Sequence, residues 1–269
     1  MRLLPLDYAV RNLGRSTGRL LLSVFGSALV VLLVLAAAAF VRGMDRSLRT
    51  TGEPNNVILL ATGSEDSVER SEISSAVASL VAATIPGIRS RAGMPYVSSE
   101  VHVQLPLKVT ADQAKGPLVT VRGITPAAML VHSQVQIVQG RLPAPGADEL
   151  MVGQMAAIRM GVLDSDLAPG RSIIIDKRPW IIVGRFAAPG TVLEAEVWTS
   201  LAAIKTATKR DTDSCVVLTL DPRHAEFADV DAFTKTRVDL ELSATTETGY
   251  YGKLAAFFGP IRVVAWITA

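Results

Sequence analysis

The sequence contains one cysteine, Cys215, so an internal disulfide bond is excluded. Because Cys215 opens an apolar run, we expect it to be a small buried hydrophobe. Charged residues make up 19% of the chain, below the roughly 25% typical of soluble domains. The deficit is local: residues 20–41 contain no charged side chain and no His, Asn, Gln or Pro. Lys and Arg are scattered elsewhere without interleaved aromatics, which argues against a nucleic-acid partner.

Motifs of catalysis and metal binding are also missing. No G-x-x-x-x-G-K-[ST] loop occurs, so the chain is not expected to hydrolyse ATP by itself. There is no H-E-x-x-H, no paired C-x-x-C and no G-x-S-x-G. His102, His132 and His224 lie far apart in the sequence, and we expect each to be an ordinary strand or surface residue. The sequence therefore predicts no enzyme, no cofactor and no metal site.

The apolar run at residues 20–41 predicts a transmembrane helix. At about 1.5 Å per residue its 22 residues span about 33 Å, enough for a hydrocarbon core of about 30 Å. Ser23, Gly26 and Ser27 form a small-residue face on which a second helix could pack closely, or they merely tolerate lipid. A cleaved signal peptide is the alternative, with a cleavage site near residues 36–39. The run is longer than the 7–15 residues of a usual signal-peptide core, which favours the membrane helix.

Flanking cations predict the direction of this helix. Four arginines and one aspartate precede it, whereas three arginines and two acidic residues follow it. This bias places the N-terminus in the cytoplasm and the following domain outside the inner membrane. The leader, residues 1–19, has Leu6, Val10 and Leu13 on one helical face, which suits a helix lying on the inner membrane surface. An unstructured basic tail is the alternative.

Residues 42–250 show alternating strand and helix signals, which predict an extracytoplasmic α+β domain with two lobes. The turn-rich entrance at residues 142–146 and the polar exit at residues 208–213 predict an inserted lobe at about residues 141–213. Strands are expected at residues 55–61, 97–109, 118–124, 171–175, 180–186, 216–220 and 238–242. Helical spacing is found at residues 69–84, 126–131, 155–160, 197–208 and 224–236.

The C-terminal residues 251–269 predict a junction and the start of a second membrane helix. Pro260 suits the first turn of a helix, and Arg262 would extend its long side chain to the outer interface. Tyr250 and Tyr251 are expected at the level of the lipid headgroups. We interpret Glu247, these tyrosines, Pro260 and Arg262 as a mechanical junction between the domain and the second membrane helix. The alternative is an amphipathic surface helix that completes a soluble domain.

Five motifs in this order resemble a known family. The stretches are residues 8–13 with 19–22, residues 139–142 with 146–153, residues 170–175 with 180–186, residues 194–198 and residues 247–251. The chain resembles the FtsX-like permease subunits of ABC transporters of the macrolide-exporter and lipoprotein-release type. The resemblance covers nearly the whole chain.

The resemblance implies a mechanical function. ATP hydrolysis by a separate cytoplasmic subunit would move the membrane helices, and the external domain would follow during export or release of a substrate. It also implies a second copy of the permease in a homodimer. Such permeases normally have four membrane helices, whereas this sequence ends inside the expected second one, so a fragment or a truncated relative is expected. The alternative is a single-pass, membrane-tethered binding or adaptor module without transport activity.

Overall fold

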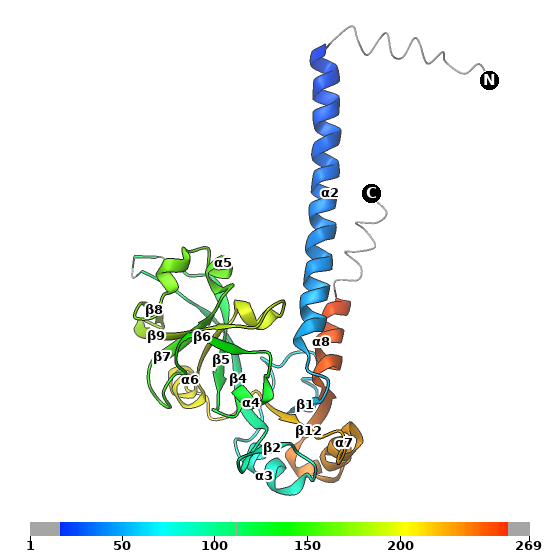
Figure 1. Cartoon of the computed structure of the whole chain (residues 1–269), viewed down its shortest axis with the longest axis vertical. Coiled ribbons are helices and arrows are strands. Elements are labelled where there is room, and N and C mark those ends of the chain that lie inside the picture. The colour runs from blue at the N-terminus through cyan, green and yellow to red at the C-terminus, as the bar shows by residue number, and fades with distance from the viewer. Residues whose placement is uncertain (1–16, 111, 114, 258–269) are drawn as a thin grey trace, which may run out of the picture. The chain divides into compact units, whose positions relative to one another are not determined.

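The computed structural model describes residues 17–257 apart from residues 111 and 114 (Figure 1). The chain divides into two compact units. The first contains Met1–Arg46 and Ala255–Ala269, and the second contains Ser47–Leu254. Of the proposed leader at residues 1–19, residues 1–16 lie outside the described residues, as do Pro260 and Arg262.

Helix α2 (Thr17–Thr51) is a single helix of 35 residues, of which residues 17–46 belong to the first unit and residues 47–51 to the second. Within the part of the chain that the structure describes, it is the one helix long and apolar enough to cross a membrane. The side chains of residues 20–40 are exposed or half-exposed in the protein alone, which suits contact with lipid, whereas Val41 and Leu48 are buried. Ser23, Gly26 and Ser27 are exposed as well, so their role as a packing face stays a prediction. The helix continues past the expected end at Val41 to Thr51.

The second unit is built on one ten-stranded sheet, which confirms the α+β class. The strand order is β12-β1-β11-β4-β5-β10-β7-β9-β6, with β8 paired to β9. The strands are β1 (Asn56–Ala61), β4 (Val97–Pro106), β5 (Leu118–Ile124), β6 (Gln136–Gly140), β7 (Glu149–Gly153), β8 (Ser172–Ile175), β9 (Arg178–Ala187), β10 (Val197–Ser200), β11 (Cys215–Thr219) and β12 (Leu242–Thr246). A separate two-stranded sheet joins β2 (Ser90–Arg91) and β3 (Met94–Pro95).

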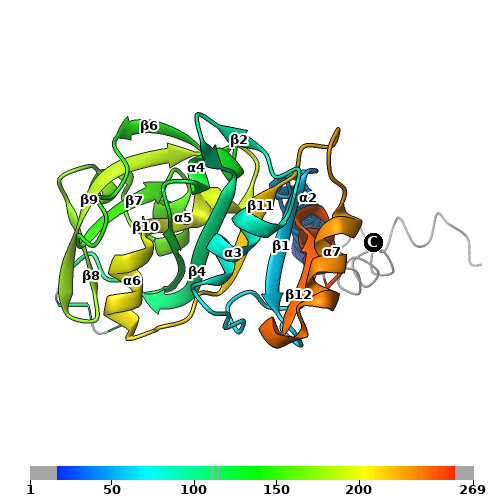
Figure 2. The ribbon, with the colours of Figure 1, turned by 90° about the horizontal axis from the view of Figure 1, so that it is seen from below.

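Strand β4 belongs to both lobes. Its first half, residues 97–100, pairs with β11, and its second half, residues 101–106, pairs with β5. The first lobe packs α3 (Val77–Thr84) and α7 (Phe227–Thr236) on one face of β1, β11 and β12 (Figure 2). The second lobe packs α5 (Ala156–Met160) and α6 (Leu201–Thr208) on β4, β5, β7 and β9. Each lobe thus has its own buried apolar core on the helix-covered face.

The sheet does not divide where the turn signals predicted. Strands β5 and β6 precede Arg141, yet they pair with β10 and β9 inside the expected inserted lobe. The second lobe therefore begins within β4, near Val101, rather than at about residue 141. After residue 213 the chain returns to the first lobe as β11, which pairs with the first half of β4. Pairing across a sheet is non-local, so turn-rich segments could not reveal the earlier boundary.

Several elements differ from the sequence expectation. The helix expected at 197–208 begins only at Leu201, after strand β10, because Ser200 caps α6 through a hydrogen bond from Ala203 N. Residues 149–153 form strand β7, which was not anticipated, and lead into the helix expected at 155–160, α5 (Ala156–Met160). Strand β6 was not anticipated either. The strand expected at 238–242 is a short 3₁₀ turn, Val238–Leu240, followed by β12. The helix expected at 69–84 is confined to α3.

Two glycines with the same backbone conformation allow a controlled prediction. Gly140 and Gly146 both have φ of 74°. A Cβ at Gly146 meets nothing within 4 Å, whereas a Cβ at Gly140 would overlap the carbonyl oxygen of Val183. That oxygen accepts a hydrogen bond from Arg141 N at 3.0 Å. We expect Gly146→Ala to lower the free energy of unfolding by about 1–2 kcal/mol and Gly140→Ala to lower it by clearly more, measured by urea denaturation. Equal losses would contradict the steric argument.

Candidate functional site

The face of the sheet opposite α3, α5, α6 and α7 carries a row of polar side chains. On β4, Glu100 and His102 point to this face together, because alternate residues of a strand share a side. Arg122 on β5 is the register partner of His102, and Trp198 on β10 is the register partner of Arg122. Cys215 on β11 lies opposite Glu100. The register of four strands therefore assembles the cluster from distant parts of the sequence.

Arg122 lies at the centre of this cluster. Its Nη1 donates to Glu100 Oε2 at 2.7 Å, and its Nε and Nη2 donate to the two carboxylate oxygens of Glu196 at 2.7 and 2.8 Å. The guanidinium also lies 5.3 Å from the centre of the Trp198 ring, whose Nε1 donates to Glu196 at 2.7 Å. Arg122 and Glu100 are almost completely buried. Buried charges are tolerated only when paired in this way.

His132 extends the cluster toward the C-terminal helix α8 (Glu247–Ala256). It follows the short helix α4 (Ala128–Val131), and its Nε2 lies 2.7 Å from Glu100 Oε1. Its Nδ1 lies 3.7 Å from Glu247 Oε1, beyond hydrogen-bonding distance, and has no closer partner among the described residues. Both side chains are buried. His132 thus connects the cluster on the sheet with the first residue of α8.

Glu247 fixes the start of α8 to the domain. Its Oε2 accepts hydrogen bonds from Asn56 Nδ2 and from Glu53 N, both at 2.9 Å. Asn56 in turn donates to the Val131 carbonyl at 3.0 Å and accepts from Thr219 Oγ1 at 2.6 Å. Glu247 is only 1% exposed, so these hydrogen bonds are shielded from water.

Residues 131–134, which we call the junction segment, contact both chain segments that lead out of the domain. Gln134 Nε2 donates to the carbonyl oxygen of Thr51, the last residue of α2, at 3.0 Å. Ser133 Oγ donates to Glu53 Oε1 at 2.7 Å. With His132 beside Glu247, these four residues join the end of α2, the start of α8 and the cluster on the sheet.

Tyr250 and Tyr251 lie inside the domain rather than on a lipid-facing surface. Each is 6% exposed, and their rings meet edge to face at 5.4 Å. The Tyr250 hydroxyl accepts a hydrogen bond from Val68 N at 3.2 Å. This corrects the expectation that both rings contact lipid headgroups: a ring held in the protein interior cannot also contact lipid. Their membership of a mechanical junction, with Glu247, stays a prediction.

The charged groups in the cluster shift one another's pKa values. Burial opposes ionisation of Glu100, but the cationic neighbours His132 and Arg122 hold its pKa well below the usual value. Burial lowers the pKa of His132, but the adjacent Glu100 outweighs this effect and the pKa is raised. Burial, reinforced by Arg122, lowers the pKa of His102, and burial raises the pKa of Glu247. His102 is therefore held neutral, whereas His132 favours the charged form.

His132 gives the domain a predicted pH dependence. Because its folded pKa is raised, its stabilising contribution is complete below the unfolded value of about 6.5 and is lost as pH rises through the folded pKa. We expect the free energy of unfolding to fall above about pH 6.5 and the His132→Gln variant to show a shallower fall. Because the pKa of His102 is lowered, this residue makes the free energy of unfolding fall as pH decreases, but only below about pH 6.5.

Urea denaturation of the full-length protein between pH 6 and 9 measures this slope, with His224→Gln as the control. The side chain of His224 is 66% exposed and lies outside the cluster. If His132→Gln and the unmodified protein lose stability in parallel, the assignment of the slope to His132 fails.

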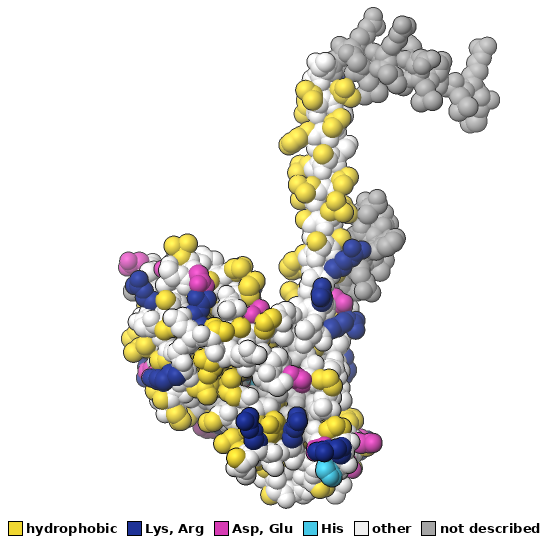
Figure 3. Space-filling view, in the orientation of Figure 1, with side chains coloured by type: hydrophobic (Ala, Val, Ile, Leu, Met, Phe, Trp, Pro, Cys, Tyr) yellow, Lys and Arg dark blue, Asp and Glu magenta, His cyan; other side chains and the backbone are white. Residues whose placement is uncertain are grey.

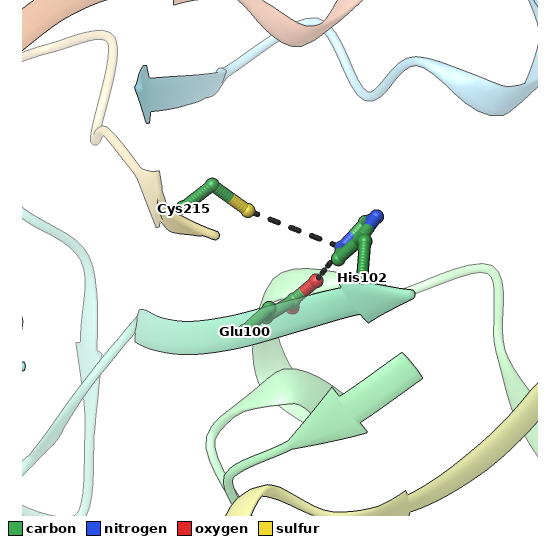
Figure 4. A group of neighbouring side chains, drawn as sticks. All are labelled: Glu100, His102 and Cys215. Atoms are coloured by element: carbon green, nitrogen blue, oxygen red, sulfur yellow. Dashed lines mark hydrogen bonds and ion pairs between the residues drawn. The ribbon is translucent and has the colours of Figure 1, made fainter. Parts of the chain in front are cut away.

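Glu100, His102 and Cys215 also form a group whose ligand atoms lie within 4.8 Å of one another (Figure 4). His102 Nε2 is 3.1 Å from Glu100 Oε2 and 3.9 Å from Cys215 Sγ. Both carboxylate oxygens of Glu100 already accept hydrogen bonds, and Arg122 brings a positive charge to one of them at 2.7 Å. Burial raises the pKa of the Cys215 thiol, which disfavours the thiolate that a metal requires. The donor set does not fit a cation.

The structure confirms some of the features that the sequence predicted for this region and shows others that the sequence did not predict. Cys215 is buried, as expected. His102 lies on strand β4 and His224 is exposed, as expected of strand or surface histidines. His132 is neither, because it is buried beside Glu100 after α4. A usable signal was present in β4: one face carries Val101, Val103 and Leu105, so the other face must carry Glu100 and His102. A charged residue on the buried side of a strand requires a partner.

A sequence model described as "MacB-like periplasmic core domain" matches residues 20–234 of this chain. No protein of curated function matches this chain. The crystal structure of the periplasmic region of MacB from Actinobacillus actinomycetemcomitans is similar at 11% identity, with a TM-score of 0.55; the match covers 77% of this chain and 95% of that one. This likeness shows a shared fold.

Two further solved structures are similar. A domain of a putative permease protein from Porphyromonas gingivalis matches at 15% identity and a TM-score of 0.48, over 72% of this chain and 90% of that one. The extracellular domain of the noncanonic ABC-type transporter YknZ from Gram-positive bacteria matches at 13% identity and a TM-score of 0.47, over 77% of this chain and 95% of that one.

Proposed function

Since the chain belongs to the family of MacB-like periplasmic core domains, we propose that it is part of an ABC transporter permease that couples ATP hydrolysis in a separate cytoplasmic subunit to movement of its extracytoplasmic domain. Permeases of this family are not themselves enzymes, in keeping with the missing phosphate-binding loop. The partners in this proposal are the ATP-binding subunit and a second copy of the permease. The N-terminus lies in the cytoplasm, as the arginine bias favours.

The observation that carries the coupling is the set of contacts at the junction segment. Helix α2 is continuous from its apolar run to Thr51, and hydrogen-bonded helices move as rigid elements. Thr51 is completely buried: its carbonyl accepts from Gln134, and its hydroxyl accepts from Val192 N at 2.9 Å. Displacement of this helix end must therefore displace the segments that it contacts.

The start of α8 is held in the same way. Glu247 accepts from Asn56, a β1 residue, and faces His132, which contacts Glu100 on β4. A movement of α8 along its axis would be passed to two strands of the sheet through buried bonds. We propose that the junction segment transmits the displacement of both helices to the sheet, with Tyr250, Tyr251, Pro260 and Arg262 contributing along α8 and beyond it.

Co-purification tests the partner assignment. The full-length protein, tagged and extracted from its own membranes in mild detergent, should bring with it a subunit that carries a phosphate-binding loop and hydrolyses ATP. Recovery without any ATPase would overturn the permease assignment in favour of the tethered adaptor module.

A distance measurement tests the coupling in the reconstituted complex. Spin labels at Lys253→Cys on α8 and Lys177→Cys in the second lobe report movement, because the native Cys215 is buried and resists labelling. We expect hydrolysis of ATP in the presence of vanadate, which traps the ATPase with ADP and vanadate bound, to shift this distance. Asn56→Ala should abolish the shift, since it removes the bonds to Glu247 and Val131. Asn55→Ala, at the exposed neighbouring position, should preserve it. A shift that persists in Asn56→Ala would refute transmission through the junction segment.

A further inference from the structure

The second lobe contains a cavity that the junction does not use. Its volume is about 780 Å³, within the range of about 300–1,000 Å³ typical of small-molecule sites. The walls come from the end of β5, the loop at residues 141–145 and the first turns of α6. Most of the lining is apolar: Ile124, Pro126, Leu142, Pro143, Pro145 and Leu201. Figure 3 shows hydrophobic side chains gathered on the surface of the lobe that carries α6.

The loop at residues 141–145 is held in place from several sides. Arg141 forms a bidentate ion pair with Glu149, at 2.6 and 2.7 Å, and Ala144 N donates to the same carboxylate at 2.8 Å. The hydrogen bond with Arg141 lowers the pKa of Glu149 to about 2, so the pair persists across neutral pH. Beyond the loop, Gly146 N donates to Ser200 Oγ at 3.0 Å. The prolines restrict the backbone further, so the wall is formed before any ligand arrives.

The charges beside the cavity are already paired. Arg141 is bound to Glu149 as described, and Lys205 Nζ donates to Ser75 Oγ, to the Asp211 carbonyl and to Asp213 Oδ1, at 2.5, 2.7 and 2.8 Å. A charged ligand would therefore lose water at an apolar wall without gaining a counter-ion, which is costly. Ser200 Oγ accepts two backbone N–H groups, from Gly146 and Ala203, so its own proton remains to be donated. The electrostatics match an uncharged occupant with an acceptor group.

We propose that this cavity binds a neutral, predominantly apolar small molecule that carries a hydrogen-bond acceptor for Ser200. The binding energy comes from apolar area removed from water against a preformed wall, which avoids the entropic cost of ordering a loop. The inference goes beyond the coupling function and does not depend on the ATP-binding subunit, since every residue that lines the cavity lies in the second lobe.

Photolabelling of the full-length protein in lipid nanodiscs tests the proposal with benzophenone, which is neutral and carries one carbonyl acceptor. Peptide mapping by mass spectrometry separates the cavity from the membrane helix, where an apolar probe also partitions. We expect saturable labelling of residues 141–145 and 201–205. Excess diphenylmethane should compete with the probe there. The anionic analogue 4-benzoylbenzoate should label these residues at least about tenfold less, a difference of 1.4 kcal/mol.

A pair of variants on α6 provides the matched control. Ala202→Trp should fill the cavity and abolish labelling, whereas Thr206→Trp, one turn further along and outside the lining, should leave it unchanged. Ile158 and Leu163 are an internal reference, because they are 73% and 71% exposed but lie outside the cavity. Labelling of the cavity no stronger than at these two residues, or insensitive to competition, would overturn the proposal whether or not Ala202→Trp folds.

Discussion

Replacing Arg122 with Met is expected to lower the free energy of unfolding by about 3–5 kcal/mol, the usual cost of removing one partner of a buried ion pair. Methionine fills similar space, so the loss comes from charge rather than packing. Glu100 and Glu196 would then face each other's charge in the interior, with three hydrogen bonds missing. Urea denaturation of the full-length protein, followed by tryptophan fluorescence, measures the change.

Arg178→Met is the matched control for this substitution. Arg178 forms an ion pair with Asp148 at 2.6 Å, but their side chains are 54% and 34% exposed. Exposed pairs contribute about 1 kcal/mol or less, so this variant should remain close to the unmodified protein. If the two variants lost similar stability, the buried ion pairs of Arg122 would contribute no more to stability than the exposed pair of Arg178.

Replacing Trp198 with Ala is expected to cost about 3–5 kcal/mol, as for other large-to-small changes in a core. Trp198 is fully buried and packs against Phe186 at 4.9 Å and His132 at 5.6 Å between ring centres. It also carries the hydrogen bond to Glu196. The alanine variant therefore loses both apolar contact and a donor to a buried carboxylate.

Trp198→Phe separates these two contributions. It keeps an aromatic ring against Phe186 but removes one of the two donors to Glu196 Oε2, which still accepts from Arg122 Nε. The expected loss is therefore the smaller one of about 1.5–3 kcal/mol for a hydrogen bond to a charged group. The same denaturation experiment applies. A phenylalanine variant as unstable as the alanine variant would mean that packing of the ring contributes little.

The sequence predicted local features of this protein well. The apolar run at residues 20–41 is helical, and the alternation at residues 97–105 is a strand with Val101 in the core. The strands expected at residues 171–175 and 180–186 are present as β8 and β9, which pair in antiparallel fashion. Each of these features depends on periodicity over a few neighbouring residues, which is the information that a single sequence carries.

The cluster could not be predicted in the same way. Glu100 and Arg122 are 22 residues apart, Glu100 and His132 are 32 apart, and Asn56 and Glu247 are 191 apart. Their meeting depends on strand register and on the order of the strands in the sheet. Trp198 was assigned to a helix because its spacing to Leu201 and Lys205 is helical, whereas pairing with β5 and β7 makes it part of a strand.

The shared strand β4 restricts which insertions and deletions this protein can accept during evolution. Adding or removing one residue within it would turn Glu100 and His102 into the apolar cores and expose Val101 to the charged face. The shift in register would affect both lobes, because β11 and β5 both pair with the ten residues of β4. Length variation among related chains should therefore be absent from β4 and concentrated in the connection between β4 and β5.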